Sequence, residues 1–425
     1  MWSTMGIPGA VSQAPHHSPS IVPFTISVPQ ALIDDLQTLL RVSRIGAKTW
    51  ENTQEAFGTT HEWLSDAKAA WIDSARFSWR SHEARINAIP NFLFKLLLAD
   101  IDLKWGTGLE YNVHFLALFS DRKDAVPVLL LHGFPGSVLE YLPVLELLKT
   151  RYTSKTLPYH IVVPSLPGYG FSSISASSDV ASFVDKEFDF QDVTKVLNHL
   201  MVHMGFGKAC ITHGGDVGTL FARIMAQEHD GCKAFHMNGL FATKEPAPSH
   251  MDGYSEEDDQ RMIHAQAFFA TGFGYSLMHQ TKPGTIGLTV ASSPLALLAW
   301  IGEKFRDWTE IPMPLETILA SVTLYWLIDT YPRCIYSNRF PSTIPFPEDK
   351  PFGVANFPRE PVPAPRAWVE KTFPNLIFYK DYEKGGHFPA LEDPTAMLAG
   401  LEEFLAKVKS MIHADGNPMS PSNLG

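Results

Sequence analysis

The sequence predicts an α/β protein with a mostly parallel, doubly wound sheet, an inserted helical segment and an N-terminal meander. Residues 125–131 form an unbroken apolar run, typical of a strand buried on both faces, and the mostly apolar runs at 160–164 and 233–237 indicate further strands. Segments with the three- and four-residue apolar spacing of helices lie between them. This alternation stops after residue 238 and resumes at residue 351, which indicates an insertion between two core strands.

The composition is that of an ordinary globular protein and excludes several classes of function. Because the net charge is −11, a phosphate backbone or an anionic membrane would repel the chain, and we expect no nucleic-acid partner. The three cysteines are too few and too widely spaced for a disulfide framework or a zinc site, which favours a reducing compartment. With no signal peptide and no apolar run long enough for a membrane span, the expected location is cytoplasmic.

Four kinds of region follow one another along the chain. The ends are polar, the meander is rich in aromatic side chains, and the core alternates strands with helices. The insertion consists of aromatic-rich helices, as expected of a lid that excludes water. The expected boundaries are flexible tails at 1–20 and 414–425, a meander packing on the core at 21–120, an α/β core at 121–238 and 341–413, and a helical lid at 239–340.

Within the meander we expect one helix and one hairpin. Apolar residues recur at helical spacing after Pro29. Residues 101–105 and 109–118 alternate apolar and polar side chains as strands do, and Gly106 and Gly108 between them suit a turn. Nothing up to residue 110 belongs to a catalytic pattern.

The strongest functional signal is Gly-Gly-Asp-Val-Gly at residues 214–218, between an apolar run at 209–211 and a helical pattern at 219–226. A strand, a sharp turn and a helix form the context of a nucleophile elbow. Glycines two residues to either side of Asp216 suit a turn in which a Cβ would clash and the central residue is strained. The alternative is a glycine-rich turn whose aspartate caps the following helix.

A carboxylate at the apex implies different chemistry from a serine. It is ionised near neutrality, so it attacks without the help of a base. It can displace a leaving group from a saturated carbon and form an ester, and a base is needed only afterwards to activate water. Asp216 therefore predicts an electrophile at an sp³ carbon, such as an epoxide or an alkyl halide.

The loop His-Gly-Phe-Pro-Gly-Ser at residues 132–137 follows the strand at 125–131 and precedes a helical pattern at 138–148. Such a loop points backbone N–H groups at the crevice beyond the strand ends. We assign the N–H groups of Phe134 and Val217 as oxyanion donors. The alternative is an ordinary tight turn.

The expected base is His387, in a Gly-Gly-His loop between the last strand pattern and the terminal helix. Its orienting acid should lie at the end of an adjacent strand. Glu360 has that position, just after the pattern at 351–357. Asp381 lies on the same strand end as the His387 loop and is expected to pair locally instead.

Together these residues resemble an epoxide hydrolase of the α/β-hydrolase superfamily, in the microsomal-type branch with an N-terminal meander and as a fungal-like soluble form. The resemblance covers roughly residues 20–412. It implies hydrolysis of an epoxide to a vicinal diol through an ester on Asp216, without a metal or an organic cofactor. The motifs are Trp79-Arg80 with Glu83, Asn87 and Pro90-Asn91-Phe92, residues 132–137, residues 214–218, Gly274-Tyr275 before residues 281–283, residues 293–305, and residues 385–388.

The resemblance also implies lid tyrosines that hydrogen-bond the epoxide oxygen and protonate the departing alkoxide. It places Tyr275 in one such role. At the second position the chain departs from the pattern, because Asn338 stands where a phenol is expected. Either Tyr336 takes the role through a local shift, or Asn338 donates through its amide.

Other functions on the same fold stay open. A haloalkane-type dehalogenase shares the aspartate elbow, but it needs halide-binding Trp or Asn groups and lacks the meander. The missing phenol leaves room for a non-hydrolytic pathway enzyme or a ligand-binding protein, although a ligand trap needs no base. The expected partner is a small apolar epoxide, because the lid is rich in aromatic and methionine side chains, and a homodimer is possible.

Overall fold

One sheet runs through the molecule. The computed structural model describes residues 20–97, 110–174, 189–240, 247–339, 344 and 346–414. Their ten strands form a single sheet in the order β1-β2-β3-β5-β4-β7-β8-β9-β10, with β6 paired to β3. The strands are β1 (Ser20–Pro23), β2 (Asn91–Leu97), β3 (Glu110–Leu118), β4 (Val126–Leu131), β5 (Tyr159–Pro164), β6 (Ser173–Ile174), β7 (Cys210–Gly214), β8 (Cys232–Asn238), β9 (Phe352–Asn356) and β10 (Leu376–Asp381).

The sheet is parallel from β5 to β10 and antiparallel from β1 to β5. Strands β4, β7 and β9 are buried along their whole length, as their apolar runs predict. The predicted fold class, with a mostly parallel doubly wound sheet, is therefore confirmed.

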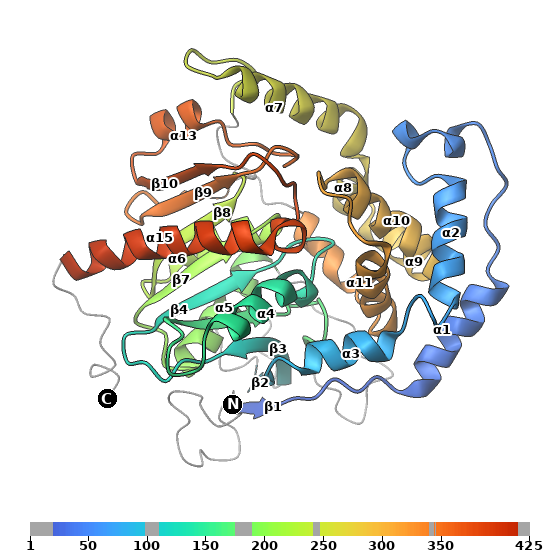
Figure 1. Cartoon of the computed structure of the whole chain (residues 1–425), viewed down its shortest axis with the longest axis horizontal. Helices are drawn as coiled ribbons and strands as arrows, with labels where there is room; N and C mark the ends of the chain where they lie inside the picture. The colour runs from blue at the N-terminus through green and yellow to red at the C-terminus, as the bar shows by residue number, and fades with distance from the viewer. Residues whose placement is uncertain are drawn as a thin grey trace.

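Helices cover both faces of this sheet (Figure 1). Helices α4 and α15 pack together on one face, and α5 and α6 pack together on the other. The core helices are η4 (Val138–Tyr141), α4 (Leu142–Arg151), α5 (Phe190–His203), α6 (Val217–Glu228), α13 (Arg366–Thr372), α14 (Pro389–Glu392) and α15 (Pro394–Ala414).

The inserted helices lie to one side of the sheet, where α10 and α11 pack against the N-terminal helices α1 and α2 (Figure 1). The N-terminal helices are α1 (Gln30–Val42), η1 (Glu51–Thr53), η2 (Glu55–Phe57), α2 (His61–Ile72) and α3 (Trp79–Asn87). The inserted helices are α7 (Glu256–Ala267), η6 (Phe268–Gly272), α8 (Gly274–Thr281), α9 (Pro283–Ala291), α10 (Pro294–Asp307), α11 (Leu315–Leu327), α12 (Tyr331–Cys334) and η7 (Ile335–Asn338).

Local sequence explains where the inserted helices begin. Ser255 and Asp258 form a reciprocal capping box at the start of α7. At α10, the Ser293 hydroxyl accepts from the Leu295 N–H, and Pro294 occupies the first helical position, where no N–H is needed. The structure also contains α8 and α9, which we did not predict as separate helices.

The meander differs in one respect from the expectation. Its strands β1, β2 and β3 extend the sheet itself, and β3 pairs on one edge with the unpredicted strand β2 and also with β5 and β6. The predicted strand at 101–105 and its turn at Gly106 and Gly108 lie outside the described residues, as do residues 1–19 and 415–425 of the two predicted tails. The helix expected at 138–148 is divided into η4 and α4, with Pro143 at the start of α4.

Within the described ranges, no single helix has both the length and the apolar character to cross a membrane. The bent pair α9 and α10, at 114° to each other, meets those criteria only when its two helices are taken together.

Candidate active site

Asp216 lies at the apex of a strained turn between β7 and α6. Its backbone has φ 52° and ψ −131°, which side chains other than glycine rarely adopt. A Cβ on Gly214 would overlap the Gly218 carbonyl, and a Cβ on Gly218 would overlap the Leu131 carbonyl. The predicted clash and the predicted strain are both confirmed.

The carboxylate of Asp216 is turned away from its own helix. It makes no capping hydrogen bond to α6, so the alternative of a simple helix cap is wrong. Its Oδ1 instead accepts a hydrogen bond of 2.7 Å from the Phe134 N–H, in the loop that follows β4. The turn therefore presents the carboxylate to the neighbouring loop.

The chain brings His387 and Glu360 to this carboxylate from two distant segments. His387 Nδ1 lies 3.0 Å from each oxygen of Glu360, and its Nε2 lies 3.3 Å from Asp216 Oδ2. The backbone N–H of His387 donates to the Trp308 carbonyl at 2.8 Å, which fixes the loop beneath the inserted helices. The structure thus places together the three residues that the sequence predicts as nucleophile, base and orienting acid.

The charges around His387 decide its protonation. Burial lowers the pKa of the imidazole, but the carboxylates of Glu360 and Asp216 outweigh burial and hold that pKa well above its ordinary value. The ring nitrogen facing Asp216 makes no aligned hydrogen bond to a described residue, despite the short distance. An imidazolium between two carboxylates is therefore the favoured state of the free site.

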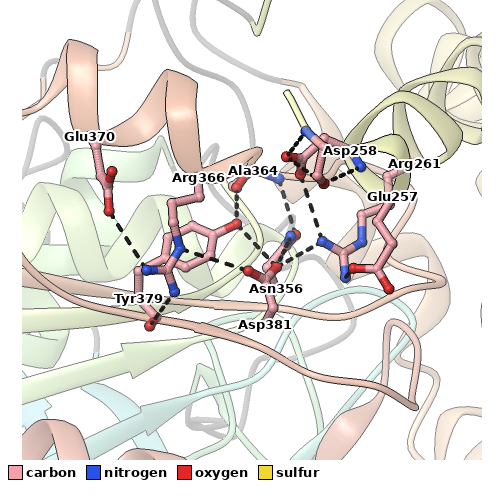
Figure 2. A network of polar contacts seen from close by, with 10 residues as sticks. Glu257, Asp258, Arg261, Asn356, Ala364, Arg366, Glu370, Tyr379 and Asp381 are labelled. Atoms are coloured by element: carbon pink, nitrogen blue, oxygen red, sulfur yellow. Dashed lines mark hydrogen bonds and ion pairs between the residues drawn. The ribbon is translucent and has the colours of Figure 1, made fainter. Parts of the chain in front are cut away.

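Asp381, the acid that we did not choose, lies in a separate polar network (Figure 2). Its Oδ1 accepts from Arg261 at 2.7 Å and from Asn356 at 2.9 Å. Arg261 comes from α7, so Asp381 ties the inserted helices to the end of β10. The sequence predicted local pairing, but these two partners of Asp381 come from distant segments of the chain, and they hold its carboxylate in this network.

The two predicted oxyanion donors lie on either side of Asp216. The Phe134 N–H already points at the carboxylate. Val217 is the first residue of α6, where an N–H has no partner within the helix. A Cβ on Gly133 would overlap the Asp216 side chain, so a glycine here permits the close approach of the loop.

Tyr275 faces the site from α8. Its ring stacks on Phe134, with centroids 6.1 Å apart, and it packs against Trp308 at 5.3 Å. Burial, with the negative charges of Asp216 and Glu360, raises the pKa of the phenol well above its usual range. Its hydroxyl therefore stays protonated, and it makes no hydrogen bond within the described part of the chain.

Tyr336 and Asn338 differ in what their polar groups contact. The Tyr336 hydroxyl donates to the Pro167 carbonyl at 2.8 Å. Asn338 is buried in η7, which packs against α8, and its Nδ2 has no hydrogen-bond partner among the residues described. The Tyr336 proton is thus engaged, whereas the amide of Asn338 still has donors to offer.

Sequence reasoning missed three residues of this region. Trp308 contacts the ring of His387 edge-on at 4.9 Å. Glu140 in η4 and Asn238 at the end of β8 are buried near the elbow. The sequence contains one signal for each of the last two residues. Glu140 lies one turn after the 132–137 loop, and Asn238 ends a core strand.

Comparisons with known proteins agree with this geometry. Residues 21–141 match the family model described as epoxide hydrolase N terminus, and residues 126–345 match the alpha/beta hydrolase fold. The solved structure of Aspergillus niger epoxide hydrolase is 41% identical, covers 92% of this chain and 97% of its own, and superposes with a TM-score of 0.80.

Curated relatives extend the likeness over most of the length. A relative from Dothistroma septosporum is 38% identical over 396 residues, which is 90% of this chain and 89% of that protein. Epoxide hydrolase 1 of Sus scrofa is 26% identical, over 91% of this chain and 88% of its own. The family model, the relatives and the superposed structure agree with the resemblance expected from the motifs, and the chain belongs to the epoxide hydrolase family of the α/β-hydrolase fold.

Proposed function

We propose that this enzyme hydrolyses an epoxide to a vicinal diol in two steps through an ester on Asp216. The main support is a carboxylate at the elbow with a ring nitrogen of His387 3.3 Å away. A carboxylate is a competent nucleophile at a saturated carbon, and the imidazole provides the base that the ester later requires.

In the first step, the Asp216 carboxylate attacks an epoxide carbon. A carbon–oxygen ester bond forms, and the ring carbon–oxygen bond breaks. The departing alkoxide takes a proton from Tyr275, whose protonated phenol faces the site. We assign the second oxygen donor to the amide of Asn338 rather than to Tyr336, because the Tyr336 hydroxyl is engaged by the Pro167 carbonyl.

In the second step, His387 takes a proton from water, and the hydroxide attacks the ester carbonyl carbon. Alkylation removes the negative charge of Asp216, so one of the two carboxylates that raise the pKa of His387 is lost. The imidazole therefore becomes a better base when a base is needed. The N–H groups of Phe134 and Val217 are the proposed donors to the tetrahedral oxyanion. Collapse of that intermediate breaks the ester carbon–oxygen bond, and the departing alkoxide takes the proton from His387 and leaves as the diol. The remaining proton of the water returns to Tyr275, so that Asp216, His387 and Tyr275 regain their starting states.

The proposed substrate is a small apolar epoxide, because the rings of Phe134, Tyr275 and Trp308 pack together beside the site, where Trp308 also contacts His387. The proposed lid comprises residues 239–340, which lie between β8 and β9. A homodimer and a cytoplasmic location stay predictions from the sequence.

Tyr275→Phe tests the proposed acid. Removing a positioned acid typically costs roughly 10²–10⁴-fold, and we expect a loss near the lower end because Asn338 still donates. The measurement is the rate of ester formation in a single turnover with styrene oxide. As a matched control, Tyr336→Phe should keep this rate within a few fold and lose about 1 kcal/mol of stability, because the Pro167 carbonyl loses its donor. Equal losses in the two variants would contradict the assignment.

The function itself is tested by one turnover in ¹⁸O-water with styrene oxide, one of the aryl epoxides. We expect the label to enter the Asp216 carboxylate and to reach the diol only in later turnovers. Labelled diol in the first turnover, with an unlabelled carboxylate, would mean direct attack by water. Halide release from a haloalkane without any diol from the epoxide would instead indicate a dehalogenase.

A further inference from the structure

Two buried polar side chains near the elbow have no hydrogen-bond partner among the residues that the structure describes. Glu140 is 4% exposed and Asn238 is 3% exposed. Within that part of the chain, neither Asn238 Nδ2, Asn238 Oδ1 nor the Glu140 carboxyl makes a hydrogen bond. Burying a polar group without a partner costs free energy, so side chains of this kind usually serve a bound water or ligand.

Both side chains converge on the residue before the nucleophile. Asn238 Nδ2 lies 3.5 Å, and Glu140 Oε1 3.8 Å, from the position that a Cβ on Gly215 would occupy. The other carboxyl oxygen of Glu140 packs against Gly136, at the end of the oxyanion loop. Glycines at both positions thus allow the two polar groups to approach the backbone that carries Asp216.

The same groups flank the base. Glu140 lies in η4, which packs against α14, and α14 begins two residues after His387. Asn238 lies next to Gly239, and a Cβ added to Gly239 would be 3.0 Å from Glu360 Cγ. His387 Nε2, 3.3 Å from Asp216, is itself without an aligned hydrogen bond among the described residues. Three buried side chains at the elbow, those of Glu140, Asn238 and His387, therefore each have a polar atom without an aligned hydrogen bond to a described residue.

We propose that Glu140 and Asn238 position the water that hydrolyses the ester on Asp216, an inference that rests on the proposed function. With His387 Nε2 they supply the two to four polar contacts that a buried water needs. The water gives one proton to His387 Nε2, and its oxygen forms the new bond to the ester carbon. Glu140 and Asn238 hold its remaining hydrogen and lone pair, and neither gains nor loses a proton overall.

The charge of Glu140 suits this positioning role. Burial raises the pKa of its carboxyl to about 8, with Asp216 and Glu360 adding to the rise and His387 opposing it. At neutral pH the group is mostly a neutral carboxylic acid, which both donates and accepts. A glutamine at this position keeps both abilities, whereas a methionine keeps only the size.

The test compares the two half-reactions with styrene oxide. Rapid quenching followed by intact-protein mass measures how fast the ester forms and how fast it disappears. We expect Glu140→Met and Asn238→Leu to slow ester loss about 10- to 100-fold, because a misplaced water reacts poorly, and to leave ester formation within a few fold. In the steady state, kcat and KM of these two variants should fall together and kcat/KM should stay near the wild-type value, because only the step after ester formation is slowed. Glu140→Gln should restore most of the rate.

Asn356→Leu is the matched control, since Asn356 is a buried asparagine on the neighbouring strand β9 whose amide donates to Asp381 and accepts from Ala364. We expect it to lose stability while ester loss keeps its rate. Unchanged ester loss in both Glu140→Met and Asn238→Leu would overturn the inference, as would equal slowing of both half-reactions. If the wild type forms no ester, the proposed function itself fails.

Discussion

The Asp216→Ala variant is expected to fold and to form neither ester nor diol. Losing the nucleophile should reduce turnover on the order of 10⁴-fold or more, since the alanine side chain cannot form the ester. Holding alanine at φ 52° should lower the free energy of unfolding by about 1–2 kcal/mol, and a chain of this size stays folded after such a loss. Diol formation from styrene oxide measures activity, and thermal unfolding measures the fold.

A second variant separates the chemistry from the backbone. Asparagine tolerates positive φ as aspartate does, and its oxygen can still accept from the Phe134 N–H. We therefore expect Asp216→Asn to match the wild type in stability more closely than Asp216→Ala and to be equally unable to form an ester promptly. Wild-type ester formation by either variant would refute the role of Asp216.

The residues of the proposed triad were predictable because each carries a local signal. Asp216 is flanked by glycines at positions that have no room for a Cβ. A Cβ on Gly214 would overlap the Gly218 carbonyl, and a Cβ on Gly218 would overlap the Leu131 carbonyl. His387 lies in a glycine loop between the last strand and the last helix. Glu360 was preferred over Asp381 from its place after a different strand, and the structure pairs Glu360 with His387 at 3.0 Å.

The second oxygen donor could not be chosen from the sequence. Tyr336 and Asn338 lie two residues apart, and only the turn of η7 determines which side chain contacts Pro167. The place of Glu140 one turn after the 132–137 loop is a weak signal, because its sequence neighbours do not show that its carboxyl will be buried. Strand β2 was missed because residues 91–97 do not alternate apolar and polar side chains and Lys95 interrupts their apolar run.

Electrostatic coupling between the two half-reactions is a property of the assembled site. In the free enzyme, Asp216 and Glu360 together favour a protonated His387. Forming the ester cancels one of these charges, so the first reaction lowers the pKa of the base for the second. A protonated imidazole cannot accept a proton from water. Ester loss in the wild type should therefore slow as the pH falls through the pKa that His387 has in the ester, and reach a plateau above it.

A His387→Gln variant should stop after the first half-reaction. Asp216 needs no base to attack, so one equivalent of epoxide is expected to remain attached to the protein. Removing the general base typically slows proton transfer by roughly 10²–10⁴-fold, and the ester should accumulate. Intact mass after mixing with styrene oxide should show an increase equal to the mass of one epoxide, with less than one diol per site in the time of many wild-type turnovers.

Glu360→Gln is the matched comparison, because it keeps the base and removes the negative charge and one of the two oxygens that lie 3.0 Å from Nδ1. Ester loss in this variant should be slower than in the wild type and faster than in His387→Gln, because a poorly oriented imidazole can still accept a proton. The order of the three rates distinguishes a base with its orienting acid from two independent groups. Diol release by His387→Gln with no detectable adduct would show that water attacks the epoxide directly, and the ester route would then be wrong.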